Sequence, residues 1–252
     1  KLHFFLGVFF HFIIGADKIK TDGRCLIKMK TAEAIVTSTV LRFLTSLQNE
    51  GYVVQEENGR YFMTYKICNL ASNITARIGI RRICSPYLRS ISHIFDESAN
   101  LSIERNMQMV YIEVVNSPNQ ELTIRKRIGN IAPMHCTGVG KLMLLNYPDH
   151  QISHLIACQG LQKFTDNTLV TKEQLCAELE KIRAHGYAFD NEECEVGVRC
   201  IAAPIRDYTG KIVAGISVSG PSIRMTDAYI LGKLPYLLDT AQQISEKLGY
   251  QE

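Results

Sequence analysis

One short stretch of the sequence brings together side chains that could do chemistry. Residues 189–200 read FDNEECEVGVRC, with four carboxylates among the first seven positions and a thiol at Cys200. Carboxylates beside a thiol suit three kinds of site: a metal centre, a cysteine-dependent hydrolase, or a pocket that binds a small molecule. Each kind needs further residues elsewhere in the chain, so each can be examined against the rest of the sequence.

The spacing supports neither a metal centre nor a hydrolase. The candidate metal ligands are His135, Cys136, Asp190, Cys194 and Cys200, but none of them forms the closely spaced cysteine pairs of structural zinc sites. A hydrolase would use Cys200 as nucleophile, with His135 or His185 as base. Cys200 begins an apolar run, however, where a thiol is usually an inert packing residue. We therefore expect no metal, no cofactor and no catalysis, with the Cys200 hydrolase as the remaining alternative.

A pocket for a small molecule explains more of the pattern. In MHCTGVGK, residues 134–141, Gly138 and Gly140 allow the backbone to approach a ligand closely, and free amides before a helix can bind an anion. Ser217 and Ser219 are two positions apart in a predicted strand, so they lie on one face of it. Their hydroxyls could hold a carboxylate or a hydroxyl group. The alternative is that both serines face solvent.

The four acids of residues 189–200 cannot all surround one anionic ligand. In a cavity of low dielectric, four carboxylates would repel it strongly. We expect Asp190 to be the ligand contact, accepting hydrogen bonds from ligand hydroxyls. The other three acids, Glu192, Glu193 and Glu195, are expected to face solvent or to pair with the arginines at positions 199 and 206.

Composition and charge describe an ordinary globular chain with a mildly basic beginning. Of its 252 residues, 46% are hydrophobic and 21% charged; residues 1–77 hold 10 basic and 6 acidic side chains, against 18 and 19 in residues 78–252. The basic excess is compatible with contact to nucleic acid. Eight cysteines without a paired framework are typical of a reduced, cytoplasmic protein. The apolar run 2–16 is shorter than the roughly 20 residues of a membrane span, so we expect a buried, Phe-rich first helix, with an export signal as the alternative.

The N-terminal pattern indicates a helix followed by a hairpin. Apolar residues at Val40, Phe43, Leu44 and Leu47 recur at helical spacing after Thr37 or Ser38, which could cap the helix. YVVQ and RYFM read as short strands joined by EENG, in which Asn-Gly favours a tight turn. This order is that of a winged helix-turn-helix, although a generic helix–hairpin fragment gives the same pattern. Residues 65–80 contain no Pro or Gly before Gly79 and predict a linking helix.

The remainder alternates between helices and antiparallel strands and predicts an α+β fold. The expected helices are 83–95 with Pro86 in the first turn, 138–147, 171–185 and Asp227–Leu248. The expected strands are 100–115, paired around a turn at Asn106, then 121–130, and a hairpin across 198–220 that turns at Asp207–Gly210.

Three motifs carry a resemblance to a known family. TSTVLRFLTSLQNEGYV, MHCTGVGKLMLL and GYAFDNEECEVGVRCIAAPIRDYTGKIVAGISVSGP resemble, in order and spacing, the IclR-type bacterial transcriptional regulators. The resemblance implies a winged helix-turn-helix in residues 1–64, of which 1–35 are atypical, a linker helix in 65–80, and a GAF- or PAS-like effector-binding domain with an antiparallel sheet in 81–252. It further implies a homodimer or homotetramer, operator DNA, and a small metabolite, often a carboxylate, with no role for a membrane.

The resemblance also assigns residues to two sites. The effector site would comprise Met134, Gly138, Gly140, Asp190, Cys200, Ser217 and Ser219, and the DNA-contacting set Ser38, Thr39, Arg42, Asn58 and Arg60. Arg42 could form a bidentate pair with guanine. We therefore expect a ligand-controlled regulator, a repressor by preference. Because residues 1–35 match poorly, the alternative is an effector-binding oligomer that no longer binds DNA.

Overall fold

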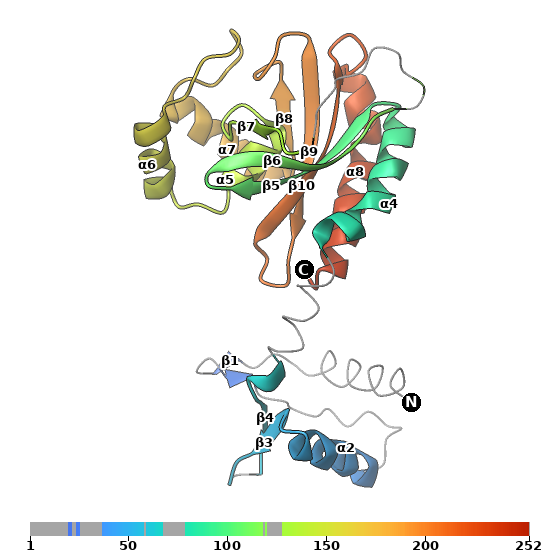
Figure 1. The fold of residues 1–252 in the computed structure, drawn as a ribbon. Helices are drawn as coiled ribbons and strands as arrows, with labels where there is room; N and C mark the ends of the chain where they lie inside the picture. Colours follow the sequence, from blue (N-terminus) through green and yellow to red (C-terminus); the bar gives the residue numbers. More distant parts are fainter. Residues whose placement is uncertain are drawn as a thin grey trace. The chain divides into compact units, whose positions relative to one another are not determined.

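A computed structural model describes most of the chain, as two compact units (Figure 1). Described are residues 20–21, 24–25, 37–57, 59–67, 79–117, 119 and 128–251, with side chains from Leu41 onward. The units comprise Lys1–Ile78 and Gly79–Glu252. The expected Phe-rich first helix, residues 121–127 of the expected strand and residues 68–78 of the expected linker helix lie outside the described residues; residues 128–130 form a turn and not a strand. Within the described ranges, no helix is long and apolar enough to cross a bilayer.

The first unit contains the predicted helix and hairpin. Helix α2 (Thr37–Asn49) is followed by the antiparallel strands β3 (Val53–Gln55) and β4 (Tyr61–Met63). Gly51 has a φ of 71°, a left-handed conformation that glycine adopts without strain, and this turns the chain from α2 into β3. Two further short strands, β1 (Lys20–Thr21) and β2 (Arg24–Cys25), pair with each other and were not predicted.

The second unit is built on one six-stranded antiparallel sheet. Its strands are β5 (Ser98–Arg105), β6 (Gln108–Val115), β7 (Ile131–Ala132), β8 (Ala188–Asn191), β9 (Val198–Arg206) and β10 (Ile212–Pro221). Their order across the sheet is β7-β6-β5-β10-β9-β8. The predicted turn lies at Asn106 and Met107, both with positive φ, which suits a two-residue hairpin loop. The α+β class and the predicted hairpin over residues 198–220 are confirmed.

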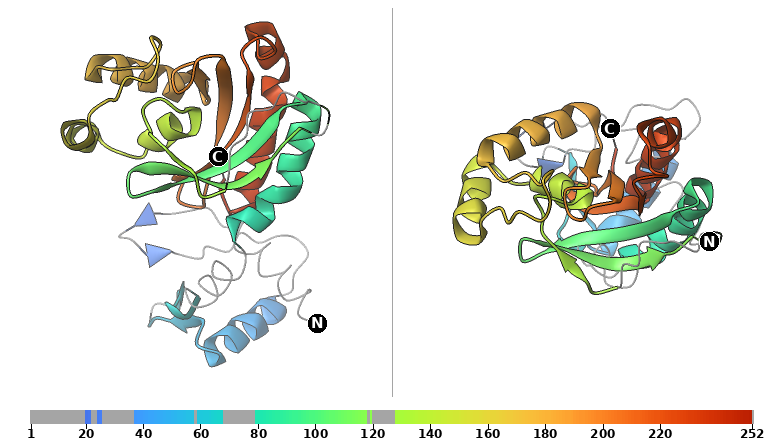
Figure 2. Two further views of the ribbon diagram at one scale, coloured as in Figure 1. Left: turned by 45° about the horizontal axis from the view of Figure 1, so that its top comes forward. Right: turned by 90° about the horizontal axis from the view of Figure 1, so that it is seen from above.

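Helices cover both faces of this sheet (Figure 2). Helices α4 (Ile80–Phe95) and α8 (Asp227–Lys247) pack on one face, while α5 (Gly138–Leu144), α6 (Asp149–Gln159) and α7 (Lys172–His185) lie on the other side. Strand alternation divides the side chains between them. Leu101, Ile216 and Val218 belong to the α4/α8 core, whereas their neighbours Asn100 and Ser217 face the opposite side. That opposite face is therefore partly polar although buried.

Some helices begin or end at other residues than the sequence predicted. Helix α4 begins at Ile80 rather than at 83, so Pro86 is its seventh residue and does not lie in the first turn. Gly79, in an extended conformation, is the N-cap and provides no side-chain hydrogen bond. Helix α5 ends at Leu144 rather than 147, because the Asn146 side chain exchanges two hydrogen bonds with the backbone of Ile212. Helix α6 and strand β8 were not predicted.

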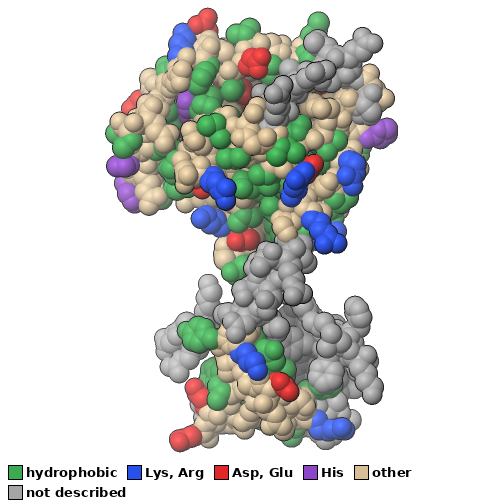
Figure 3. Space-filling model, in the orientation of Figure 1, with side chains coloured by type: hydrophobic (Ala, Val, Ile, Leu, Met, Phe, Trp, Pro, Cys, Tyr) green, Lys and Arg blue, Asp and Glu red, His purple; other side chains and the backbone are tan. Residues whose placement is uncertain are grey.

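The surface is mixed in charge. On the face shown in Figure 3, basic and acidic side chains are interspersed over both units, with histidines at the edge that α6 forms. His150 and His154, both exposed on α6, belong to this edge. The view therefore shows no broad field of one sign on the side chains that the structure describes.

Candidate functional site

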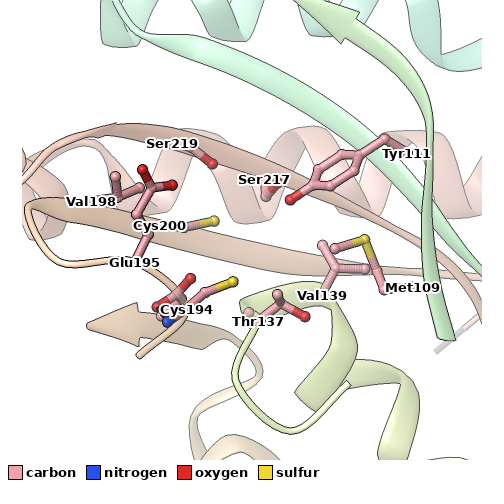
Figure 4. A pocket seen from close by; sticks show the side chains of 12 residues that line it. Met109, Tyr111, Thr137, Val139, Cys194, Glu195, Val198, Cys200, Ser217 and Ser219 are labelled. Atoms are coloured by element: carbon pink, nitrogen blue, oxygen red, sulfur yellow. Dashed lines mark hydrogen bonds between the residues drawn. The ribbon is translucent and has the colours of Figure 1, made fainter. Parts of the chain in front are cut away.

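A buried pocket lies between the sheet and the beginning of α5 (Figure 4). Five of the predicted residues line it: Gly138, Asp190, Cys200, Ser217 and Ser219. The other lining residues are Thr137 and Val139, which belong to the 134–140 segment expected to form one wall, and Met109, Tyr111, Cys194, Glu195 and Val198, which were not predicted as effector contacts. Figure 4 shows the sulfur atoms of Cys194 and Cys200 and the hydroxyls of Tyr111 and Ser217 turned toward the same space.

Sheet register explains why residues far apart in the sequence meet here. Asp190 of β8 lies opposite Cys200 of β9, and Cys200 lies opposite Ser219 of β10. Directly opposed residues of antiparallel strands project to the same face, so an acid, a thiol and a hydroxyl form one row. Ser217 is two residues away on β10 and faces the same side, opposite Ala202. The expectation that the two serines share a face toward a cavity is therefore met.

The two glycines of the 134–141 segment have different structural roles. A Cβ at Gly138 would lie 3.0 Å from the Cβ of Ala202, so this glycine lets α5 approach the sheet beside the pocket. A Cβ at Gly140 would lie 2.5 Å from the Cα of Met134. Gly140 and Met134 therefore pack on each other, and neither lines this pocket; Met134 lines a neighbouring cavity of about 170 Å³ with His135. The turn into α5 brings Met134 and Gly140 together away from this pocket, and their contact with a ligand stays a prediction.

Asp190 shapes the acidic loop as well as the pocket. Its Oδ1 accepts hydrogen bonds from the backbone amides of Glu193, at 2.8 Å, and Cys194, at 3.3 Å. The side chain is buried. A carboxylate that accepts two amides holds a turn in place, so the position of Cys194 and Glu195 in the lining depends on Asp190.

Two threonines from the 161–170 segment hold the same loop from outside. The Thr165 hydroxyl donates to the Glu192 carbonyl at 2.6 Å, and the Thr168 hydroxyl to the Glu193 carbonyl at 2.7 Å. The Glu192 carboxylate accepts from the Gly197 amide at 2.6 Å. The loop is thus fixed mainly by hydrogen bonds to its own backbone.

The expected arginine partners of the acidic loop are engaged elsewhere. Arg199 donates to the carboxylate of Asp227 at 2.5 Å and Arg206 to the carbonyl of Gly210 at 2.9 Å. Glu193 instead meets Lys141 of α5, with 2.6 Å between Oε1 and Nζ. The prediction of arginine pairing is wrong for Glu193, because a lysine three residues after Gly138 reaches it from behind the pocket.

Lys141 is fully buried and has a second acidic neighbour. Its Nζ lies 3.6 Å from Oε1 of Glu178 on α7. Burial raises the pKa of Glu193 to about 7, while Lys141 acts in the opposite direction and Asp190 adds to the rise. The loop beside the pocket therefore carries a carboxyl group that titrates near neutral pH.

The pocket is nearly closed, and none of the described residues that line it is basic. Its free volume is about 10 Å³, the room of about one water molecule. Asp190 and Glu195 are the charged residues of the lining. Burial raises the pKa of Tyr111 well above its usual range, so the phenol keeps its proton and can donate. A ligand must therefore displace side chains on entry and bind to neutral donors.

Neither metal binding nor thiol catalysis finds support in the geometry. Among the described residues, no three His, Cys, Asp or Glu side chains converge to hold a metal ion. His135 Nε2 lies 3.0 Å from the carbonyl of Gln162, and the ring does not line the pocket. The hydrogen bond with Cys194, together with burial, raises the pKa of Cys136. Neither His135 nor His185 is among the residues that line the pocket with Cys200.

The predicted DNA-contacting residues are only partly described. Arg42 is exposed on α2, and Arg60 is exposed directly before β4. Asn58 and the side chains of Ser38 and Thr39 lie outside the described residues. The helix and hairpin that would carry this set are present, and the contacts themselves stay a prediction.

Comparison with known proteins places the chain in a family. The sequence profile described as "Bacterial transcriptional regulator IclR C-terminal" matches residues 72–246. This chain belongs to the IclR family. The transcriptional regulator KdgR of Escherichia coli K12 is 31% identical over 216 residues, covering 85% of this chain and 82% of KdgR. The repressor AllR of the same strain is 32% identical, covering 84% of this chain and 78% of AllR.

Solved structures agree with this assignment. The Thermotoga maritima IclR structure matches 97% of this IclR-family chain and 98% of its own, at 30% identity and a TM-score of 0.65. The Agobacterium tumefaciens repressor BlcR matches 84% of each chain, at 26% identity and a TM-score of 0.70. The chain is therefore a member of a family of DNA-binding transcriptional regulators and not an enzyme.

Proposed function

We propose that this chain is a repressor whose DNA binding is controlled by a small carboxylate or sugar acid bound between the sheet and α5. The observation that carries the proposal is the convergence of Asp190, Cys200, Ser217 and Ser219 in one buried pocket, although they come from three separate strands. Gly138 completes the wall opposite them. Such a concave, buried set of a few polar groups is what a small-molecule site requires.

The charges of the lining favour a hydroxylated acid over a simple anion. With Asp190 and Glu195 present and no basic side chain in the lining, a ligand carboxylate gains nothing from charge pairing there. It would take its hydrogen bonds from hydroxyls, such as those of Ser217 and Ser219. Hydroxyl groups of the ligand would then donate to Asp190. A hydroxy acid or sugar acid offers both kinds of group.

The N-terminal residues would contact operator DNA. In this proposal residues 1–64 form the winged helix-turn-helix, α2 reads the major groove with Ser38, Thr39 and Arg42, and Asn58 and Arg60 lie along the backbone. Exposure of Arg42 and Arg60 supports this assignment. Residues 65–80 would link them to the effector domain 81–252, in a homodimer or homotetramer.

The test is an anisotropy titration of the full-length protein on DNA from upstream of its own gene, with a panel of hydroxy, keto and sugar acids. At least one acid should change DNA affinity, and Ser217→Ala should abolish that response while retaining DNA binding. Ser222→Ala is the matched control, because this serine follows β10 and does not line the pocket. An unchanged affinity across the panel would refute the switch.

The second candidate is an effector-binding oligomer that does not bind DNA. It is favoured by the poor motif agreement of residues 1–35. It predicts acid binding together with no salt-dependent affinity for duplex DNA. In contrast, a DNA-binding protein should lose affinity steeply as salt rises, and Arg42→Gln should reduce the steepness.

A further inference from the structure

Three polar atoms on β5 are buried and have no hydrogen-bond partner among the residues that the structure describes. They are Ser98 Oγ, Asn100 Oδ1 and Ser102 Oγ, and all three residues are fully buried. Buried polar atoms in native proteins are nearly always hydrogen-bonded, so three orphans in alternate positions of one strand require an explanation. Alternate positions face one side of a sheet, so the three atoms form a row.

The row continues the polar surface of the pocket. Asn100 lies opposite Ser217, and Ser98 lies opposite Ser219. The Asn100 amide nitrogen donates to the Ser219 hydroxyl at 3.2 Å. In this orientation of the amide, Oδ1 of Asn100 is the acceptor that has no partner among the described residues. The pocket face of the sheet thus extends from Ser219 onto β5.

Tyr111 covers this extension. It stands on β6 opposite Ser102, and its hydroxyl lies beside Ser217 of β10 (Figure 4). Strand β5 lies between β6 and β10 in the sheet, so a ring that reaches from β6 to Ser217 must cross β5 near Asn100. The ring is buried. The small free volume of the pocket is therefore partly a consequence of where Tyr111 lies.

We infer that Ser98, Asn100 and Ser102 form a second half of the effector site, which a ligand uncovers by turning Tyr111 aside. The inference rests on the proposed function. It adds that these residues recognise the hydroxyl groups of the ligand. Residues two apart in a strand are separated by about 7 Å, so the row spans about 14 Å. A hydroxylated chain of four to six carbons covers about half of this row, so from Ser217, which lies opposite Asn100, it reaches a neighbouring serine of the row, while a two-carbon acid does not.

The chemistry of the row selects hydroxyl groups. Asn100 Oδ1 can only accept, and each serine hydroxyl can donate or accept. A ligand hydroxyl that donates to Asn100 also relieves a buried acceptor left unpaired in the free protein, which strengthens its contribution. A site built to bind a hydroxyl discriminates strongly against a ligand that lacks it.

The test compares a long and a short hydroxy acid by calorimetry on the full-length protein. D-gluconate carries hydroxyls along six carbons, and glycolate has one hydroxyl on two carbons. Asn100→Ala should weaken D-gluconate by about tenfold or more and leave glycolate within about twofold. Ser102→Ala, a smaller change, should weaken D-gluconate in the same direction. Asn116→Ala is the control, because Asn116 is exposed just after β6.

Each other result has a distinct meaning. If Asn100→Ala weakens both acids equally, Asn100 acts only through Ser219 and the second half-site is refuted. If glycolate binds while D-gluconate does not, or if neither variant affects D-gluconate, the half-site is refuted and the proposed function stands. If neither acid binds the wild-type protein, the hydroxy-acid effector itself is wrong, and the half-site falls with it.

Discussion

Lys141 is a charged side chain that water does not reach, and two carboxylates compete for it. Glu193 contacts it at 2.6 Å and Glu178 lies 3.6 Å away. The Oε2 atom of Glu193 has no partner among the described residues. Removing a carboxylate from water favours its protonated form, and Asp190 on β8 adds to this effect. The result is the pKa of about 7 for Glu193.

This pKa makes stability depend on pH in a defined direction. The pKa of Glu193 is raised from its ordinary 4.5, so between these two values the folded protein binds a proton that the unfolded chain has released. Its contribution to the free energy of unfolding is therefore present below about pH 4.5 and is lost as pH rises to 7. Glu178 remains to balance Lys141 when Glu193 is protonated.

We predict that wild type loses stability relative to Glu193→Gln as pH rises from 5 to 8, by about 3 kcal/mol at most. The glutamine has the same shape and does not titrate, so the difference isolates this carboxyl group. Urea unfolding of both proteins at several pH values measures it. A difference that stays constant, or grows in favour of wild type as pH rises, contradicts the raised pKa.

At the scale of elements, α5 and the sheet are in close contact because two glycines lack side chains. A Cβ at Gly215 of β10 would lie 2.7 Å from Cγ1 of Val139. Neither atom can yield without moving α5 or the strand, since both residues are buried. The distance between α5 and the sheet, and with it the width of the pocket, depends on this contact.

Gly215→Ala should therefore destabilise the protein by about 1–3 kcal/mol, as overpacking does. Gly232→Ala is the matched control: Gly232 lies within α8 and a Cβ there meets no atom within 4 Å, so this change should be neutral or stabilising by up to about 1 kcal/mol. Adding Val139→Ala to Gly215→Ala should restore part of the loss. Equal stability of the two alanine variants, measured in urea, would show that α5 is not held at this distance.

The sequence predicted those elements whose signals are local. The hairpin of β9 and β10 was predicted from two apolar segments with a turn at Asp207–Gly210, and α7 from Leu175, Leu179 and Ile182 on one helical face. Strand alternation placed Ser217 and Ser219 on one face, whereas Cys200 was assigned to the site by the resemblance to the IclR-type regulators. Helix α6 buries only Ile152 and Leu155 and so has a short apolar stripe; it was missed although Pro148 and Asp149 mark its start and Gly160 its end.

Residues that reach the site through distant pairing were not predictable. Tyr111 lines the pocket only because β6 lies two strands from β10, and the register of β5 and β6 shifts between Leu101 and Ser102. The contact between Lys141 and Glu193 joins residues that are 52 positions apart. No periodicity reveals such partners. A fully buried lysine in an apolar helix, as in GVGKLML, was the available signal for an acid nearby.

At the scale of the molecule, the proposed regulator binds its two ligands through different units. The pocket belongs to Gly79–Glu252, while α2 and its hairpin belong to Lys1–Ile78. If an effector changes DNA affinity by some factor, thermodynamic linkage requires DNA to change effector affinity by the same factor. The coupling between the units can therefore be measured either from DNA affinity or from effector affinity.

We predict that the two factors agree. DNA affinity by anisotropy with and without effector gives the first, and effector affinity by calorimetry with and without operator DNA gives the second. Asn116→Ala, exposed and outside the pocket lining, serves as a control that should leave both unchanged. Unequal factors would show that a further equilibrium, such as a change in the number of subunits, accompanies binding.

Asp190 both lines the pocket and holds the loop, and this affects the rates at which a ligand binds and leaves. The carboxylate that faces the pocket also accepts the amides that fold residues 190–194. A ligand hydroxyl that donates to Asp190 competes with those amides. Ligand binding and rearrangement of the loop therefore occur together. Association should then saturate at a rate set by the loop rather than by diffusion, and release should be delayed by the same barrier. Such a sensor would average out brief fluctuations in metabolite concentration and respond to sustained ones.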